Sequence, residues 1–520
     1  MNRKVTRRRS TRWTVGSLLM ILLAAGQAMG QDWPQWGHDA TKNMVSPTAK
    51  NILTDFQPGR RKGRSEHIDP ATTRNIRWIA KLGSQSYGNP TVSNGRVFIG
   101  TNNASPRDPK YKGDRSTVYC LDEDTGQLLW QFNLRKLGAG KVSDWEYLGI
   151  CSSPTVDGKH VYVVTNLGEV VCLDVHGMAN GNNGPVQNEG QYLAGPGKPA
   201  IKMTATDADV IWRFDMRSEL GVFPHNVTSS SALVFGNRVY ATTSNGVDWS
   251  HVNIPAPRAP TLIAMDKKTG KLSGEESSGI SERLLHCNWS SPGAGEANGR
   301  PLVFFGGGDG FCYAFDPVPV PDEDGYGILK EAWRFDCNPA KYRTKEGEPI
   351  RYATHDGPSE LIATPVFHKD RVYIAVGQDP EHGEGLGALS CIDATKRGDI
   401  SQNGLIWRYT EINRTISTLS IADGLVYAAD YAGIVHCLDA ISGEVFWKHD
   451  TLGHIWGSTL VADGKLFVGN EDGVLTILKT GKQKQLIAEI EFDGPIYSSP
   501  VVANDTLYIA TMTHLFAIGK

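Results

Sequence analysis

Short runs of alternating apolar and polar residues recur along most of the chain. Residues 161–164 read VYVV, 371–374 read RVYI and 425–428 read LVYA, and glycine-containing turns separate most such runs. Alternation over four to eight residues, with many β-branched and aromatic side chains, is typical of short antiparallel strands. The pattern therefore predicts an all-β protein.

Two motifs repeat in a fixed order around these runs. Residues 119–130 read YCLDEDTGQLLW and residues 436–447 read HCLDAISGEVFW, and a second motif, such as SSPTV at 152, stands ahead of each copy. Both motifs can be followed through eight copies, although the last two copies of the first motif, at 476–478 and 517–519, lack its aspartate. A unit of four strands in about forty residues is the period of a propeller blade.

A four-stranded sheet of this size cannot bury both of its faces alone, but a radial array of such sheets can. The sequence therefore predicts an eight-bladed β-propeller of four-stranded antiparallel blades. Residues 76–79 (IRWI) precede the first unit, and the last unit has only three strands before Lys520. We expect the N-terminal strand to complete the last blade and close the ring.

Several tryptophans stand at the same position near the end of a unit. A large flat side chain there can pack against the neighbouring blade, and its indole N–H needs an acceptor. We interpret this set as blade-docking residues rather than as cofactor-stacking residues, because stacking would require only one or two of them. The set comprises Trp78, Trp130, Trp212, Trp333, Trp407 and Trp447.

The first thirty residues depart from the repeat. A basic stretch is followed by apolar residues 13–25 and by small residues at 28–30. This order is typical of a cleaved signal peptide, and the apolar stretch is shorter than the roughly 20 residues that a membrane anchor needs. We assign 1–30 as a signal peptide, 31–75 as an N-terminal extension that packs on the propeller, and 76–520 as the propeller. The arginines at 7–9 leave twin-arginine export as a minor alternative.

Charge and cysteine positions limit the partners and the location. Without the six cations of residues 1–30, the chain has 47 Lys and Arg against 56 Asp and Glu, a net charge of about −9. This balance argues against nucleic acid or an anionic membrane as a partner. The first cysteine is Cys120, so no thiol lies near the cleavage site for a lipid. We expect a soluble monomer, exported to the periplasm or the exterior, neither membrane-spanning nor lipid-anchored.

The cysteines do not suggest a disulfide framework. Four of them occupy one slot in four separate blades, where equivalent points are too far apart for a bridge; they are Cys120, Cys172, Cys391 and Cys437. The remaining four could pair in ways that the sequence leaves open; they are Cys151, Cys287, Cys312 and Cys337.

With both motifs in hand, the chain resembles the pyrroloquinoline-quinone (PQQ) repeat propellers. LDEDTGQLLW at 121–130 looks like their tryptophan-docking motif, and the likeness extends over about residues 76–520. WD40 propellers are similar in outline, but no Trp-Asp dipeptide occurs here. The resemblance implies one of two activities: a PQQ- and calcium-dependent dehydrogenase of alcohols or sugars, or a non-catalytic protein such as the scaffold of outer-membrane protein assembly.

The cysteine pattern separates the chain from much of the dehydrogenase branch. Those enzymes often hold a disulfide between adjacent cysteines against the quinone, and some attach haem through C-x-x-C-H. This chain has neither Cys-Cys nor C-x-x-C-H. We therefore expect no haem, and we favour the non-catalytic branch.

The segments that lead into the innermost strands converge on the propeller axis, where such folds usually hold a ligand. Long insertions cluster on the same face, at 102–117, 134–150, 246–260, 273–288, 338–361 and 378–388. We call this face, around the entries to the innermost strands, the funnel face. Its candidate binding residues are His225, Asn226, Asn288, Trp289, His355, Arg414, His454 and Trp456. The alternative is that these side chains only line a water-filled channel and bind no specific ligand.

Specific roles follow for two kinds of ligand. If a quinone binds, the resemblance implies Trp289 or Trp456 as the stacking residue and Arg414 as the carboxylate partner, while Asp356 and Glu146 are the candidates for calcium ligand or catalytic base. If a metal binds directly, the candidate ligands are His225, His355, Asp356 and His454.

The sequence thus favours an exported propeller that acts as a non-catalytic ligand-binding or protein-assembly module through its funnel face. A PQQ- and calcium-dependent dehydrogenase of small alcohols or sugars is the alternative. A protein-interaction hub that uses long loops such as 338–361 is a third possibility.

Overall fold

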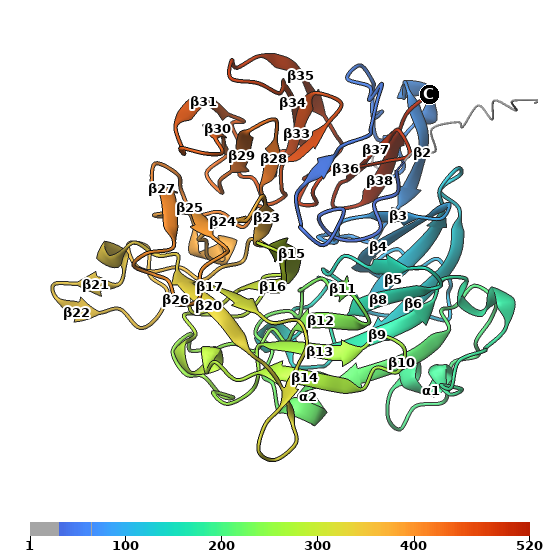
Figure 1. Cartoon of the computed structure of the whole chain (residues 1–520). Helices are drawn as coiled ribbons and strands as arrows, with labels where there is room; N and C mark the ends of the chain where they lie inside the picture. The colour runs from blue at the N-terminus through green and yellow to red at the C-terminus, as the bar shows by residue number, and fades with distance from the viewer. Residues whose placement is uncertain (1–30, 64) are drawn as a thin grey trace, which may run out of the picture.

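The computed structural model describes residues 31–63 and 65–520, and eight of its sheets are blades arranged around a central axis (Figure 1), while β21 (Thr344–Lys345) and β22 (Glu348–Pro349) form a separate two-stranded sheet. In each blade four strands follow one another in antiparallel order, with the first strand innermost. The predicted eight-bladed propeller is confirmed. The predicted signal peptide, 1–30, lies outside the described residues.

Blades 1 to 4 occupy the first part of the ring. Blade 1 contains β3 (Thr91–Ser93), β4 (Arg96–Asn102), β5 (Arg115–Asp122) and β6 (Leu128–Arg135). Blade 2 contains β7 (Thr155–Asp157), β8 (His160–Val164), β9 (Glu169–Asp174) and β10 (Val210–Asp215). Blade 3 contains β11 (Leu233–Phe235), β12 (Arg238–Thr242), β13 (Leu262–Asp266) and β14 (Leu272–Glu276). Blade 4 contains β15 (Gly293–Ala297), β16 (Arg300–Gly306), β17 (Phe311–Phe315) and β20 (Glu331–Asp336).

Blades 5 to 8 complete the ring. Blade 5 contains β23 (Val366–His368), β24 (Arg371–Ala375), β25 (Leu389–Asp393) and β27 (Leu405–Tyr409). Blade 6 contains β28 (Ser420–Ala422), β29 (Leu425–Ala429), β30 (Ile434–Asp439) and β31 (Val445–Asp450). Blade 7 contains β32 (Leu460–Ala462), β33 (Lys465–Gly469), β34 (Val474–Lys479) and β35 (Leu486–Glu491). Blade 8 contains β36 (Val501–Ala503), β37 (Thr506–Ala510), β38 (His514–Ile518) and β2 (Ile76–Lys81).

The remaining elements are short and lie in the connections. Extra strands are β1 (Val45–Ser46), β18 (Val320–Pro321), β19 (Gly327–Leu329), β21 (Thr344–Lys345), β22 (Glu348–Pro349) and β26 (Gly398–Asp399). The α-helices are α1 (Glu189–Ala194) and α2 (Met216–Leu220), and 3-10 turns occur at Pro70–Thr72, Gly140–Val142, Gly177–Asn180, Ile280–Arg283, Ala340–Tyr342 and Pro380–His382. Within the described residues, every helix is too short and too polar to cross a membrane.

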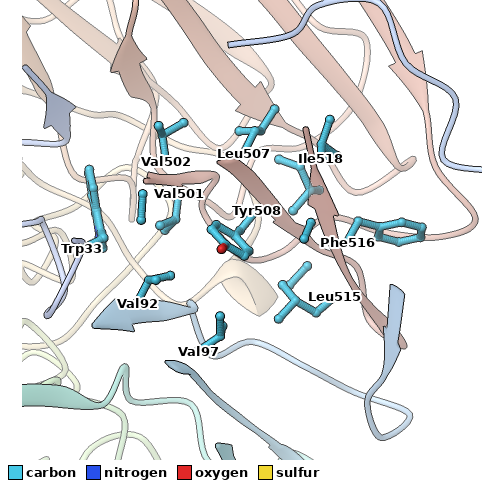
Figure 2. Packing of buried hydrophobic residues seen from close by; sticks show 14 of the residues in the cluster. Trp33, Val92, Val97, Val501, Val502, Leu507, Tyr508, Leu515, Phe516 and Ile518 are labelled. Atoms are coloured by element: carbon cyan, nitrogen blue, oxygen red, sulfur yellow. The ribbon is translucent and has the colours of Figure 1, made fainter. Parts of the chain in front are cut away.

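The N-terminal strand closes the ring as the sequence predicts. Strand β2 pairs antiparallel with β38, with Trp78 opposite Ala517. Figure 2 shows the apolar packing between blades 8 and 1, where Val92 and Val97 of blade 1 lie near Tyr508 of blade 8. The core is divided in this way among the interfaces between blades, so that each blade depends on its neighbours for burial.

The six repeated tryptophans all make one kind of contact. Each indole N–H donates to a backbone carbonyl of the next blade: Trp78 to Glu123 (2.8 Å), Trp130 to Val175 (3.0 Å), Trp212 to Lys267 (3.1 Å), Trp333 to Ala394 (3.1 Å), Trp407 to Ala440 (3.2 Å) and Trp447 to Gly481 (2.9 Å). A small residue lies directly opposite these rings in the sheet, such as Cys120 opposite Trp130 and Cys437 opposite Trp447. The repeated cysteine therefore makes room for the tryptophan.

The glycine of the Asp-x-x-Ser/Thr-Gly turn has both a backbone role and a packing role. Gly443 has φ +76°, and a Cβ on it would lie 2.7 Å from the ring of Trp407. Gly126 meets Trp78 in the same way, at 2.6 Å. The aspartate of the same turn closes the loop: the Asp122 carboxylate accepts hydrogen bonds from the backbone N–H and the hydroxyl of Thr125.

Residues 31–46 cross the end of the axial channel at which the innermost strands end. Their backbones bond to the inner strands or adjoining residues of blades 1, 2 and 4 to 8, at Val92, Val156, Ala294, Phe367, Leu419, Val461 and Asn504. Strand β1 adds in parallel to β32. Lys42 is fully buried there, where its Nζ donates to Gln35 Oε1 and to the carbonyl of Trp36. This segment closes the channel opposite the funnel.

All eight cysteines lie within the described residues, and none is disulfide-bonded. Among the four that the sequence left open, Cys287, Cys312 and Cys337 are buried and Cys151 is partly exposed. The pKa of the Cys151 and Cys337 thiols is raised to about 12, mainly because the two sulfur atoms are shielded from water.

Candidate functional site

The funnel contains a cavity of about 330 Å³ on the propeller axis. Four aromatic residues contribute to its wall: Tyr87, Trp145, Trp289 and Trp456. Asp379 and Glu381 bring two carboxylates, and none of the described residues that line the cavity is a lysine or an arginine. The cavity continues into an axial space of about 180 Å³, of which Trp36 of the N-terminal extension forms part of the lining.

The aromatic rings are fixed by hydrogen bonds and by one another. The indole of Trp289 donates to the carbonyl of Val227 at 2.9 Å, and the indole of Trp456 donates to Glu471 Oε2 at 3.2 Å. Trp456 also packs on Tyr497, with ring centroids 4.7 Å apart. Because their N–H groups already have acceptors, these rings offer apolar faces rather than donors to a ligand.

The carboxylates at the cavity are positioned by a tight turn. Asp379 caps the 3-10 turn Pro380–His382 by accepting from the backbone N–H of Glu381 at 2.9 Å. Its other oxygen lies 3.2 Å from the amide nitrogen of Asn226, which reaches across from blade 3. The cavity thus combines aromatic faces with negative charge, a combination that attracts cations.

A cluster of histidines lies beside this cavity. His225 precedes β11, His251 lies between β12 and β13, and His286 precedes β15. One ligand atom from each of these three lies within 4.8 Å of the others, and the two Nε2 atoms of His225 and His286 are 2.9 Å apart. A fourth imidazole, that of His382, stacks on His286 with centroids 4.9 Å apart.

Burial favours the uncharged form of three of these imidazoles, those of His225, His286 and His382. Burial, followed by the charge of neighbouring His286, lowers the pKa of His225 to about 3. Burial also lowers the pKa of His286 and of His382. Glu360, fully buried next to the cluster, has its pKa raised to about 7 by burial. Neutral imidazoles keep a lone pair that can bind a metal ion.

The structure brings only part of the predicted site together. Trp289, Trp456 and Asn226 line the cavity, and His225 lies in the histidine cluster. Asn288 is buried and has a structural role, donating to the carbonyl of Asn245 and accepting from the backbone of Gly308.

Arg414 lies away from the cavity lining. It is almost fully buried, and its guanidinium donates to the carbonyls of Thr354 and His355. It thus binds the 338–361 insertion, whereas the resemblance implied that it would pair with a quinone carboxylate.

The four predicted metal ligands are not assembled. His355 is exposed and pairs with Asp356 at 2.8 Å, while His454 bonds to Glu471 and Glu384 and stacks on Tyr431. Only His225 of that set belongs to a metal-competent group in the described part of the chain. The segments belong to blades far apart around the ring, so a shared face did not bring the side chains together. Glu146, the other predicted acid, is exposed and does not line the cavity.

The residues that sequence reasoning missed come from the long insertions. His251 lies in 246–260, His382 and Asp379 in 378–388, His286 in 273–288 and Glu360 in 338–361. Their position on the funnel face was visible in the sequence, but which insertions meet one another depends on loop conformation.

Comparison with known proteins places the chain in a family. The family profile described as "Outer membrane protein assembly factor BamB" matches residues 61–284 and 431–517, more than half of the chain. The chain belongs to this family of PQQ-repeat propellers.

Individual relatives are distant. Quinoprotein alcohol dehydrogenase PedH of Pseudomonas putida is 22% identical over 89% of this chain and 75% of its own length. Outer membrane protein assembly factor BamB of Shewanella oneidensis is 28% identical over 25% of this chain and 35% of its own length. Since one relative is a dehydrogenase and the other an assembly factor, the function must be argued from the site.

Two solved structures are similar at low identity. BamB from Moraxella catarrhalis has a TM-score of 0.49 and 15% identity, with 84% of this chain and 95% of that chain covered. Quinohemoprotein alcohol dehydrogenase from Comamonas testosteroni has a TM-score of 0.46 and 13% identity, with 94% and 81% covered.

Proposed function

We propose that this protein is an exported, non-catalytic binding propeller whose funnel face takes a neutral or cationic organic group, carried by a small molecule or by an assembly partner. The observation that carries the proposal is the cavity lining, in which the described residues supply four aromatic rings, two carboxylates and no lysine or arginine. Aromatic faces attract cations by about 0.5–2 kcal/mol, more when water is excluded. A cavity of about 330 Å³ is at the lower end of the range for small-ligand pockets.

The lining also suggests how the ligand would lie. Trp289 and Trp456 contribute fixed apolar surfaces, and Asp379 is held close to Asn226 at the wall. A ligand with a flat or alkylated cationic head could place that head against the rings and its charge near Asp379. Membership in the BamB family is compatible with a basic segment of a partner protein as the natural occupant.

Export is part of the proposal and rests on the sequence of residues 1–30. The basic stretch, the apolar core and the small residues at 28–30 have the order of a cleaved signal. N-terminal sequencing of protein from a periplasmic or culture fraction should begin at Gln31, whereas a mature chain that begins at Met1 would contradict export.

A quinone-dependent dehydrogenase is the alternative, supported by the relative that is 22% identical along most of the chain. PQQ carries three carboxylates, which need cationic partners. The described cavity lining supplies none, and the Arg414 guanidinium donates to backbone carbonyls instead. The predicted acids Asp356 and Glu146 also lie outside the lining. The residues present therefore do not fit PQQ with calcium in this cavity.

Tryptophan fluorescence can test the proposal with two probes of similar size and opposite charge, benzyltrimethylammonium and benzenesulfonate. We expect saturable quenching by the ammonium and at least tenfold weaker binding of the sulfonate, a ratio that corresponds to about 1.4 kcal/mol. Asp379→Asn should weaken ammonium binding about tenfold, whereas Asp324→Asn, on an exposed hairpin, should leave it unchanged. Equal affinity for the ammonium and the sulfonate probes would contradict the proposed selectivity.

The same fluorescence titration with PQQ and calcium tests the alternative function. Saturable PQQ binding together with reduction of an electron-accepting dye by added alcohol would replace the proposal with the dehydrogenase.

A further inference from the structure

The histidine cluster beside the funnel has the geometry of a metal site. We propose that His225, His251 and His286 bind one divalent transition-metal cation of the zinc type. Their ligand atoms already lie within 4.8 Å of one another without an ion. The site is distinct from the aromatic cavity, because none of these three side chains belongs to the cavity lining.

The imidazole nitrogens are oriented as metal ligands usually are. Histidines that bind metals normally give their second ring nitrogen to a carbonyl, a carboxylate or another acceptor, which fixes the tautomer and the ring. His225 Nδ1 lies 2.6 Å from the carbonyl oxygen of Val247, which places the lone pair of this ring on Nε2. That Nε2 is hydrogen-bonded to His286 Nε2 at 2.9 Å, so a bound ion would replace the proton that the two rings share.

The buried carboxylate of Glu360, next to His286, is a further reason to expect a metal ion here. It is fully buried, and neither of its carboxylate oxygens has a hydrogen-bond partner among the described residues. His286 Nδ1, 3.4 Å from Glu360 Oε1, is also unpartnered. Buried polar groups without partners are costly. If His286 binds a cation through Nε2, its Nδ1–H points to Glu360, and the ion offsets the buried carboxylate charge. Carboxylate–histidine–metal triads have this form.

The donor set selects the class of metal. Imidazole nitrogen suits zinc, copper, nickel and iron, whereas calcium and magnesium require oxygen ligands. Two nitrogens on a tetrahedral zinc, each about 2.0–2.1 Å from the ion, are about 3.3 Å apart, so the His225–His286 pair is almost in place. His251 is partly exposed on the 246–260 insertion and needs the larger movement.

The remaining coordination position can be reached from outside. A second cavity, of about 400 Å³, is lined in part by His251, His286 and His382. His382 Nδ1 lies 3.2 Å from Gln378 Oε1, so its Nε2 is free as well. The ion therefore has a path of entry, with a fourth imidazole and space for water next to it.

Metal titration of the chelator-treated full-length protein tests this inference without any funnel ligand. We expect one Zn²⁺ per chain by calorimetry, a higher melting temperature with Zn²⁺, and intense visible absorption from four-coordinate Co²⁺. Glu360→Gln should weaken Zn²⁺ binding by roughly 10–100-fold, as loss of an outer-shell partner does. His286→Gln and His251→Gln should each weaken it by more than Glu360→Gln.

Two features keep the test decisive. His251 is partly exposed, so His251→Gln should fold even if the buried His286→Gln does not. His67→Gln, at an exposed position in the N-terminal extension, is the matched control and should bind Zn²⁺ like the unchanged protein. Absence of stoichiometric Zn²⁺ binding, or unchanged binding by His251→Gln, would overturn the inference. Because the probe is the metal alone, failure here leaves the aromatic-cavity proposal standing, and the reverse also holds.

Discussion

The perimeter of the ring and the funnel wall of blades 3 to 5 are built from different kinds of sequence. At the perimeter, one contact recurs: an indole at an equivalent position of the outermost strand donates to the next blade, as Trp130 does to Val175 and Trp447 does to Gly481. At the funnel wall, His225, His251 and His286 come from segments of unequal length, and no two are held alike. The repeat therefore supplies the contacts between blades, and we propose that the insertions supply the binding chemistry.

Deleting residues 76–81 would test the perimeter most severely. The deletion removes β2, the fourth strand of blade 8, and opens the ring. We expect a loss of unfolding free energy greater than the roughly 3–5 kcal/mol that truncation of one buried tryptophan costs, measured by urea denaturation. Deleting residues 322–326, an exposed hairpin tip, should change little. If both deletions had equal effects, closure by β2 would not matter.

A single docking residue should have the next largest effect. Trp333 is fully buried, so Trp333→Ala should lower the free energy of unfolding by about 3–5 kcal/mol. Trp249 is 57% exposed on the 246–260 insertion, and Trp249→Ala should stay within about 0.5 kcal/mol. A small loss for Trp333→Ala would contradict the view that the perimeter carries stability.

The turn glycines allow a finer comparison. Gly443 (φ +76°) and Gly424 (φ +78°) share a left-handed backbone, but only a Cβ on Gly443 would meet Trp407. Both alanine variants lose about 1–2 kcal/mol to backbone strain, and Gly443→Ala should lose about 1–3 kcal/mol more from the clash. Urea denaturation of the pair measures the packing contribution directly; identical values would remove it.

The smallest expected effect concerns Lys42 in the segment that closes the channel. Burial lowers its pKa from 10.5 to about 7. Between these values the unfolded chain binds more protons than the folded chain, so the contribution of Lys42 to stability rises as the pH rises from 7 toward 10.5. Relative to Lys42→Met, the melting temperature should increase by about 1–3 °C between pH 7 and pH 9.5. A difference that is constant with pH would show that Lys42 is not buried as a neutral amine.

The repeat explains why so much of the perimeter could be predicted. Strand order, the closing strand and the blade number all follow from two motifs that recur in a fixed order. The sequence also predicted that each of these indole N–H groups would have a hydrogen-bond acceptor, because a buried indole N–H requires one. The partner residue followed once the blade order was known, as with Trp407 and Ala440.

For the funnel, the sequence could predict which face of the propeller carries the candidate residues, but not which of these residues contact one another. Trp289 and Trp456 line the axial cavity, and their segments lead into the inner strands, which is why the sequence places them on this face. His355 and His454 were expected to meet His225 for the same reason, but one is exposed and the other bonds to Glu471. Which side chains converge depends on insertions without a repeat, and no spacing rule links His251 to His286.

X-ray diffraction at the zinc edge, on crystals of the full chain grown with Zn²⁺, tests most directly whether the insertions of blades 3 to 5 carry the chemistry. The account predicts one strong anomalous peak per chain, about 2.0–2.1 Å from the Nε2 atoms of His225 and His286 and with His251 drawn in as the third ligand. A map with no peak among these imidazoles, while the protein is folded and zinc is in excess, would contradict it.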